Sequence, residues 1–364
     1  MKALTVGGAM IDTIAIIASD RIERMRMTNA DNSFLLLEEG RKTEALEVST
    51  HVGGGAVNAA VTMARLGLDV GALVKLGKDA RAETLLAHLL QEGVSTRWAM
   101  RDGRAPTGAS VLLSSHDSNA AIFTFRGANT LLEERDLRME AFAADVVYVS
   151  SLSNESADAF PAIVERAKGQ GALVATNPGV RQLSSRGGAF QETLRHIDVL
   201  GINRSEADAL VPGLVTRFGE GARGLTAKPG EVLPRLAARG FIGGGHEMGM
   251  IDFFTGLNKL GPRYIVVTDG REGAFLGAPD AILYCPVLET KVAGTAGAGD
   301  AFNATFTAYV AMGRSAEEAL RAATLNSGSV VNHVDTQRGL LSIGEVDRRL
   351  SESEETLKVR RWSH

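Results

Sequence analysis

Short apolar runs rich in β-branched residues alternate along this chain with longer segments of helical spacing. The runs lie at 3–8, 70–77, 145–151, 172–179, 197–203 and 264–270. Helical spacing marks 58–67, 82–93 and 157–171. Strands that alternate with helices pair in parallel and are buried on both sides, so helices must cover both faces of their sheet. The alternation therefore predicts an α/β fold whose ligands bind at the carboxyl ends of the strands.

Two regions interrupt this alternation and are predicted to form β-hairpins. Residues 13–50 hold two strand-like pieces on either side of a turn near Gly40, and residues 106–126 hold two more around the turn-forming run 114–119. Inserted early into an α/β chain, these hairpins could form a small sheet that projects from the core and covers a site. Two ordinary surface hairpins would have the same pattern, so the residues alone leave both interpretations open.

Charge and cysteine content exclude several classes of protein. A formal net charge of −4 over 364 residues gives no electrostatic basis for binding nucleic acid. Cys285 is the only cysteine, so the chain can form neither an internal disulfide nor a cysteine-based zinc site. No stretch reaches the ~20 apolar residues that cross a bilayer. Asp12 interrupts the apolar N-terminal run, which we interpret as a core strand rather than a signal peptide. We expect a cytoplasmic protein that binds no membrane.

Two further segments carry no predicted function. The basic segment 358–364 follows an acidic run, a pattern typical of a frayed, solvated tail. Residues 218–250 are rich in loop formers and are predicted to be a mobile insertion. Within them, His246 and Glu247 lack the second histidine of the H-E-x-x-H spacing, so loop chemistry is favoured over a metal site.

Residues 292–302, VAGTAGAGDAF, place three glycines ahead of one acid. The apolar run 301–313 that follows has helical spacing, so Gly297, Ala298 and Gly299 sit at a predicted helix N-terminus. The first amides of a helix have no partner inside it and carry the positive end of the helix dipole. A backbone with so few side chains at that point is predicted to wrap an anion such as a phosphate.

The acid of this stretch, Asp300, lies at or next to the predicted N-cap and has two interpretations. As a cap, its side chain would accept a hydrogen bond from an amide two or three residues on, which stabilises a helix by ~1 kcal/mol. As a general base, it would take a proton from a hydroxyl beside a transferring phosphate, which needs both the acid and the bare amides. The stretch alone favours neither.

A second glycine-rich stretch, 53–55, precedes Asn58, and another predicted helix begins there and ends at Gly67. Its spacing is close to the dinucleotide-binding fingerprint, but the last glycine is missing and no acid closes a strand about 20 residues on. A dinucleotide-dependent oxidoreductase is therefore a weak rival interpretation. The G-x-x-x-x-G-K-[ST] pattern of P-loop enzymes does not occur.

Together these motifs resemble the ribokinase-like (PfkB) family of carbohydrate and nucleoside kinases. The family's N-terminal glycine pattern matches 53–77, and its C-terminal G-A-G-D pattern matches 294–305. Three shorter pieces follow the family's order and complete a resemblance over residues 3 to about 335. They are the N-x-x-E element at Asn203 and Glu206, the T-x-G-x-x-G element at Thr268, Gly270 and Gly273, and the substrate-binding Asp12.

The resemblance implies a fold, a reaction and cofactors. The fold is the ribokinase-like three-layer α/β fold, in which a mostly parallel central sheet has helices on both faces and a small β-sheet forms a lid. The core would comprise 1–12, 51–105 and 127–364, and the lid would comprise 13–50 and 106–126. The implied reaction transfers the γ-phosphoryl group of ATP, with Mg²⁺, to a hydroxyl group.

The resemblance also implies a role for individual residues. Asp300 would be the general base, and the backbone of 296–299, including Gly297, Ala298 and Gly299, would be the anion hole. The residues assigned to the substrate are Asp12, Gly54, Gly55, Asn58 and Arg126. Those assigned to the nucleotide are Asn203, Thr268, Gly270, Gly273 and Asn326, with Glu206 holding Mg²⁺ through water.

Two positions depart from the family pattern. Gly294 stands where the family usually has an aspartate that helps to bind a monovalent cation in potassium-activated members, which argues against K⁺ activation. Thr305 replaces a smaller residue on the helix after Asp300, and we interpret it as a local packing change. Neither change removes the base or the anion hole.

The acceptor is less well determined. Only 5% of the residues are aromatic, and the segments assigned to the substrate offer no obvious stack for a nucleobase, so a sugar is favoured over a nucleoside. Phe34 in the predicted lid would suit the nucleoside alternative. A sensor that binds ATP and sugar without turnover is a further rival, and a homodimer could form through an exposed edge of the lid sheet.

Overall fold

The structure is a computed structural model, and it describes residues 1–18, 23–26, 33–36, 40, 42–115, 120–227, 230–353 and 355–363. Its main sheet has ten strands. In spatial order they are β18 (Arg360–Ser363), β17 (Ala281–Cys285), β16 (Ala274–Ala278), β15 (Tyr264–Thr268), β12 (Val199–Asn203), β11 (Leu173–Asn177), β10 (Val146–Ser150), β1 (Lys2–Gly7), β6 (Asp69–Leu76) and β7 (Met100–Arg101). From β15 to β7 every pairing is parallel, while β16, β17 and β18 pair antiparallel. All six predicted strands lie in the parallel part.

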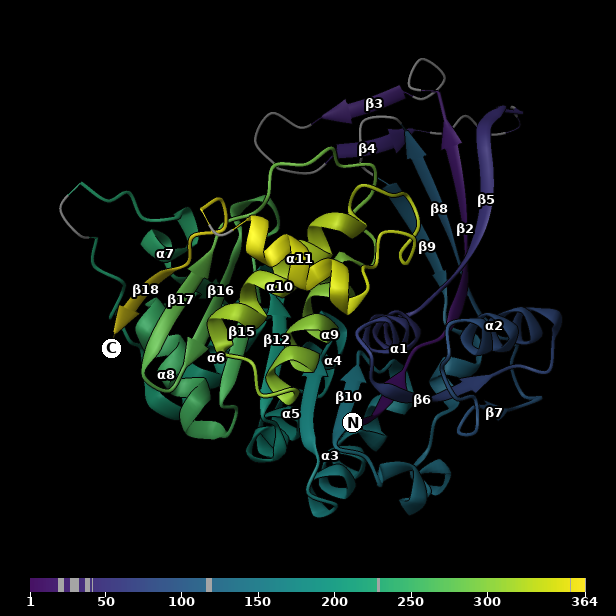
Figure 1. Cartoon of the computed structure of the whole chain (residues 1–364), viewed down its shortest axis with the longest axis horizontal. Helices are drawn as coiled ribbons and strands as arrows, with labels where there is room; N and C mark the ends of the chain where they lie inside the picture. The colour runs from purple at the N-terminus through teal and green to yellow at the C-terminus, as the bar shows by residue number, and fades with distance from the viewer. Residues whose placement is uncertain are drawn as a thin grey trace.

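Helices cover both faces of this sheet (Figure 1). On one face lie α3 (Phe160–Gly169), α4 (Val180–Ser185), α5 (Gly187–Thr193), α6 (Arg204–Phe218) and α8 (Met250–Leu260). On the other lie α1 (Gly55–Arg65), α2 (Ala80–Gln91), α9 (Ala298–Ala311), α10 (Ala316–Val330) and α11 (Ile343–Glu352). Because successive strand residues point to opposite faces, Val147 of β10 joins one core and Tyr148 the other. The predicted three-layer α/β fold is confirmed.

A second, smaller sheet rises from one end of the main sheet (Figure 1). Its strand order is β5 (Ala45–Gly53), β2 (Met10–Ile17), β8 (Gly108–Ser115) and β9 (Ala120–Phe125). The predicted hairpin of 106–126 is present as the antiparallel pair β8 and β9. Of its predicted turn, residues 116–119 lie outside the described part of the chain.

The hairpin predicted around Gly40 is wrong in its pairing. The strand after Gly40, β5, pairs with β2, whereas the strand before it, β4 (Ser33–Leu36), pairs with β3 (Glu23–Arg26). Pairing with β2 gives β5 a long register that places His51 opposite Asp12. The long pairing of β5 with β2 is therefore formed in place of a short hairpin around Gly40, although the spacing of turn residues alone favours the hairpin.

The predicted frayed tail is also wrong. Residues Arg360–Ser363 form β18, which adds to the main sheet beside β17, and Trp362 is buried against the core. The Arg360 guanidinium lies 4.7 Å from the Tyr284 ring centroid, and Arg361 forms an ion pair with Asp280. The basic residues therefore border a strand rather than a solvated tail.

The segment 218–250 contains structure of its own. It includes α7 (Arg235–Arg239) and the antiparallel pair β13 (Phe241–Gly243) and β14 (His246–Met248). Phe241 is fully buried and its ring stacks on Phe253 of α8 with centroids 3.9 Å apart. His246 forms a contact with Glu220 at 3.0 Å. Over the residues that the structure describes, no three His, Cys, Asp or Glu side chains form a metal cluster, and no helix is suited to cross a membrane.

Candidate active site

The two glycine-rich stretches meet in space. Helix α1 follows the first stretch and packs beside α9, which follows the second. The Asn58 side-chain Nδ2 donates a hydrogen bond to Asp300 Oδ2 at 2.8 Å. The backbone N–H of Ala56 donates to the carbonyl of Gly8, just beyond β1, at 3.1 Å. Both helix N-termini therefore lie at the carboxyl ends of the central strands, where an α/β fold binds its ligands.

The first glycine stretch is closely surrounded by protein. A Cβ on Gly53 would lie 2.1 Å from Asp12 Oδ2, and one on Gly55 would lie 2.8 Å from Ser150 Cβ. Gly54 has a φ of +99°, and a Cβ there would lie 2.6 Å from the carbonyl oxygen of Gly8. These glycines let β5, β2 and α1 approach one another, so packing alone accounts for them.

The second stretch differs in what surrounds its glycines. Gly297 is the N-cap of α9, with a left-handed φ of 77°, and a Cβ there would lie 2.6 Å from Thr336 Cβ. A Cβ on Gly299, in contrast, would meet nothing within 4 Å. Packing therefore does not require a glycine at 299, and this exposed residue lies in the first turn of a helix, where an anion site would be.

Asp300 is not the N-cap of its helix. It is the third residue of α9, and the capping position belongs to Gly297, whose capping involves no side-chain hydrogen bond. The expectation that Asp300 lies at or next to the cap is therefore wrong, because Asp300 lies three residues after the cap. Because the helix begins at Ala298, the Asp300 carboxylate does not cap it. The carboxylate instead accepts a hydrogen bond from Asn58.

The orientation of the Asn58 amide is fixed by two residues that the sequence motifs did not indicate. Its Oδ1 accepts hydrogen bonds from Thr336 Oγ1 at 3.0 Å and from Gln337 Nε2 at 2.9 Å. Two donors on Oδ1 leave Nδ2 to face Asp300. Gln337 is itself held by the Val52 carbonyl and by His88, whose Nε2 lies 2.6 Å from Gln337 Oε1.

The charge of Asp12 acts on Asp300. Asp12 lies on β2, is buried and accepts a hydrogen bond from Ser110. Burial raises the pKa of Asp12, partly offset by that hydrogen bond. Burial likewise raises the pKa of Asp300; the Asn58 hydrogen bond opposes this rise and the Asp12 charge adds to it. A carboxyl group of the smaller sheet and one of helix α9 therefore flank one site.

Asn203 and Glu206 form a capping box at the start of α6. Asn203 Oδ1 accepts from the Glu206 amide at 3.0 Å, and Glu206 Oε2 accepts from the Asn203 amide at 2.8 Å. Burial raises the pKa of Glu206 to about 7, and the Asp300 charge adds to the rise. Burial also raises the pKa of Tyr148, and the charges of Asp300 and Glu206 add to that rise. Glu206 is thus a cap and also a buried carboxyl group on the Asp300 side of the fold.

The residues assigned to the nucleotide divide into two groups. Thr268 ends β15, and Gly270 and Gly273 follow it with φ values of +54° and +96°, in the turn that leads to β16. Asn326 does not line an open pocket: it is fully buried, donates to Thr305 Oγ1 at 2.8 Å and accepts from the Leu341 amide at 2.9 Å. Its side chain joins α10 to its neighbours, and its assignment to the nucleotide stays a prediction.

Three remaining predicted positions have clear surroundings. Arg126 follows β9 and donates a hydrogen bond to Ser153 Oγ. Within the described residues, it forms no hydrogen bond or ion pair with Asp12 or Asp300. Thr305 is fully buried and accepts the Asn326 hydrogen bond, as expected of a packing change. A Cβ on Gly294 would lie 3.1 Å from the His333 carbonyl oxygen, so an aspartate there would require that loop to shift.

The chain is similar to several known kinases. A family model described as pfkB family carbohydrate kinase matches residues 16–214 and 247–342. A deoxyribokinase of Salmonella typhi is 26% identical over 345 residues, which cover 94% of this chain and 99% of the relative. Among solved structures, the ribokinase of Arabidopsis thaliana in complex with ribose and ATP is 21% identical with a TM-score of 0.68, covering 96% of this chain and 98% of that one. A Methanocaldococcus jannaschii nucleoside kinase is 18% identical with a TM-score of 0.69, covering 97% and 99%.

Proposed function

The chain belongs to the pfkB family of carbohydrate kinases, and from that premise we propose that it transfers the γ-phosphoryl group of ATP to a hydroxyl group of a sugar or sugar-like acceptor. The observation that carries the proposal is the contact between Asn58 and Asp300 at 2.8 Å. It holds the start of α1 against the Asp300 carboxylate of α9. A Cβ on the preceding residue of α9, Gly299, would meet nothing within 4 Å. Base and anion hole are thus side by side, as phosphoryl transfer to an alcohol requires.

In this proposal Asp300 takes the proton of the acceptor hydroxyl. The hydroxyl oxygen forms a bond to the γ-phosphorus while the bond from that phosphorus to the bridging oxygen breaks, and ADP leaves. The backbone amides of 296–299 stabilise the charge on the transferring group. Asp12 holds the acceptor, and the Asn58 hydrogen bond keeps the carboxylate aligned.

The residues present fit a magnesium ion held mainly by phosphate and water. Mg²⁺ prefers oxygen ligands and keeps several waters, so it needs one or two carboxylates rather than a protein cage. Glu206 is the buried carboxyl group available on the Asp300 side, and Asn203 orients it. When bound, the ion would neutralise phosphate charge.

The smaller sheet supports a sugar as the acceptor. Cross-strand register puts His51, Ser110 and Thr124 on the same face as Asp12, and all of them are polar. Hydroxyl-rich substrates suit such a row of hydrogen-bonding groups. We propose that this sheet is a lid whose Asp12 face closes over the acceptor and excludes water.

A nucleoside is the second candidate acceptor. The next row on the same face of the sheet is Ile14, Leu112 and Ile122, which could contact an apolar base. The side chain of Phe34, the proposed aromatic stack, lies outside the described part of the structure.

The opposite face of the smaller sheet supports a homodimer. Val48, Val111, Phe123 and Phe125 share that face, and Phe123 and Phe125 are 60% and 53% exposed. An exposed apolar patch of this kind is typical of an interface. We propose that a second copy covers it, and we expect Phe123→Lys to change a dimer into a monomer in sedimentation equilibrium. A wild-type monomer would refute this part of the proposal.

The function is tested by incubating the protein with Mg·ATP and a panel of pentoses, hexoses, sugar acids, inositols and nucleosides. ADP release and the mass of the phosphorylated product are measured for each acceptor. We expect one class of sugar to stimulate ADP release and to gain one phosphoryl group. Stimulation by nucleosides alone would establish the alternative. ATP binding without any stimulated release would favour a sensor.

A further inference from the structure

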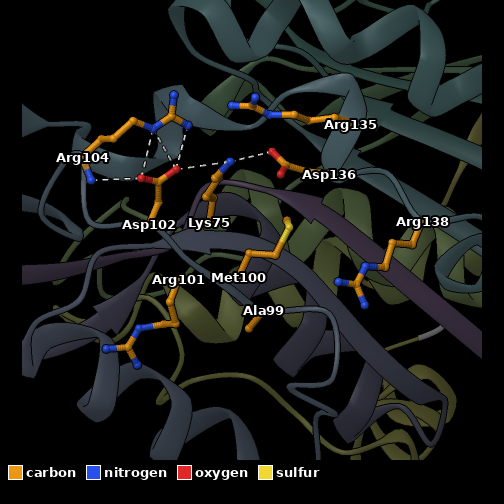
Figure 2. A pocket seen from close by; sticks show the side chains of 9 residues that line it. All are labelled: Lys75, Ala99, Met100, Arg101, Asp102, Arg104, Arg135, Asp136 and Arg138. Carbon is orange, nitrogen blue, oxygen red and sulfur yellow. Dashed lines mark hydrogen bonds and ion pairs between the residues drawn. The ribbon is translucent and has the colours of Figure 1, made fainter.

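A cavity of about 590 Å³ lies at the end of β6, apart from the residues proposed for catalysis (Figure 2). Its walls come from β6, from the segment 99–104 and from the segment 135–138. The lining residues are Lys75, Ala99, Met100, Arg101, Asp102, Arg104, Arg135, Asp136 and Arg138. Five of these side chains are cationic and two are carboxylates, so the lining carries an excess of positive charge.

The centre of the cavity is a buried ion pair that joins its walls. Lys75 is only 5% exposed, and its Nζ lies 2.6 Å from Asp136 Oδ2 and 3.4 Å from Asp102 Oδ2. Arg104 adds a further contact to Asp102 at 2.7 Å. Because a buried ammonium group must keep its partners, these four side chains hold the walls and are not free to bind a ligand.

The remaining three guanidinium groups are differently placed. Figure 2 shows Arg101, Arg135 and Arg138 spaced around the central ion pair. Arg101 donates from Nε to the Gly77 carbonyl at 2.8 Å, and one of its terminal nitrogens pairs with Glu83, whose side chain is 71% exposed. Arg135 pairs with the partly exposed Glu133. Such solvated pairs contribute little and exchange readily. Arg138 is exposed and, within the described residues, has no carboxylate within ion-pair distance.

We propose that this cavity is a second anion site, which binds a small molecule bearing a phosphate group through Arg101, Arg135 and Arg138. A guanidinium group matches a phosphate with two parallel hydrogen bonds, and such charge-assisted bonds are stronger than neutral ones. The volume is that of an ordinary small-molecule pocket. Inorganic phosphate, a sugar phosphate and a nucleotide share this chemistry.

The position of the cavity links it to both ends of the β8–β9 hairpin. The segment 99–104 leads into Thr107, which is buried at the start of β8 and donates from its amide to Asp79 at 2.7 Å. The chain that leaves β9 is joined to the segment before β8, because the Ala128 amide donates to the Pro106 carbonyl at 2.8 Å. This chain then continues to 135–138. A phosphate that bridges the two walls would therefore tie together the two attachments of the proposed lid.

The site is tested by isothermal titration calorimetry with three separate probes: inorganic phosphate, ribose 5-phosphate and AMP. Arg135→Gln/Arg138→Gln should weaken the probe that binds here by about tenfold or more, since two charge-assisted contacts are removed. Arg348→Gln, an equal charge change per residue on α11, is the control and should bind as the wild type does. Gly299→Val removes binding at the proposed catalytic anion hole and should leave this binding unchanged.

Thermal unfolding of each variant without ligand establishes that it is folded. Which of the three probes binds identifies the source of the phosphate. Wild-type affinity in the double variant, an equal loss in Arg348→Gln, or no saturable binding of any probe up to about 10 mM would overturn the proposal. If binding disappears in Gly299→Val but persists in the double variant, the phosphate occupies the catalytic site and this cavity is not a binding site.

Discussion

Two helices of this protein begin with glycine-rich sequence, but the surroundings of their glycines differ. At the start of α1, Gly53, Gly54 and Gly55 are each pressed against protein atoms. At the start of α9, Gly299 faces open space. The first set allows two sheets and a helix to approach one another; the second leaves room for something that is not protein. Glycine content alone therefore does not separate a glycine that packing requires from one that it does not, whereas what a Cβ would touch does.

Gly54→Ala should have the largest effect on stability, because it adds a side chain where the first stretch is closely packed. Alanine would have to adopt a φ near +99° with its Cβ 2.6 Å from the Gly8 carbonyl oxygen. Strain and overpacking together should cost about 3 kcal/mol or more of unfolding free energy. Urea denaturation measures this cost. A variant as stable as the wild type would show that the stretch is not a packing device.

Gly299→Val tests the open stretch, and here we expect catalysis rather than folding to suffer. A branched side chain beside the anion hole should lower turnover by ~10²-fold while the urea midpoint changes little, because no protein atom is displaced. Gly344→Val is a matched control. Gly344 is also the second residue of its helix, α11, and a Cβ there also meets nothing within 4 Å. Equal activity losses in the two variants would remove the distinction between these helix starts.

Gln337→Met tests how the two stretches are joined. Without the Gln337 donor the Asn58 amide is less firmly oriented, so we expect turnover to fall by ~10-fold. The Asn58 hydrogen bond lowers the pKa of Asp300, so its weakening should move the acid limb of the pH–rate profile to higher pH. Thr336→Val leaves Gln337 in place and should have a smaller effect of the same kind. An unmoved acid limb in Gln337→Met would contradict the positioning role.

Glu206→Gln should change the stability of the fold by an amount that depends on pH. The folded state raises the pKa of Glu206 from 4.5 to about 7, so the wild type loses stability as pH rises through that range. Glutamine carries no charge to bury. The variant should therefore exceed the wild type by about 1–3 kcal/mol of unfolding free energy at pH 8.5, and by nothing below pH 4.5. Parallel stability curves at all pH values would refute this.

Periodicity and motif spacing predicted the parallel strands, both helices of the site and the residues of its two glycine stretches. These features are local in sequence, so the residues themselves report them. Pairings between distant segments were not predictable in the same way. The partner of β5 and the addition of β18 to the main sheet depend on register between segments far apart. The segment 358–364 is charged and holds only two apolar residues, Val359 and Trp362, so it resembles a tail until its neighbouring strand is known.

The site shows the same limit at the scale of single side chains. Thr336 and Gln337 orient Asn58 from almost the other end of the chain, and no motif indicates them. Asn326 lies in a segment that resembles the family, but its side-chain amide forms hydrogen bonds to Thr305 and Leu341 within the protein. Sequence spacing identifies candidate residues, whereas the hydrogen bonds that consume or orient them appear only in three dimensions.

The central claim is that the helix start at 297–300 performs the chemistry with Asp300 as its base. The most direct test compares acceptor-stimulated ADP release and calorimetric Mg·ATP binding in the wild type and in Asp300→Asn. Asparagine keeps an oxygen for the Asn58 hydrogen bond but cannot take the proton. We predict that turnover falls by about 10²–10⁴-fold while ATP affinity stays nearly unchanged. Wild-type turnover in Asp300→Asn would contradict the claim.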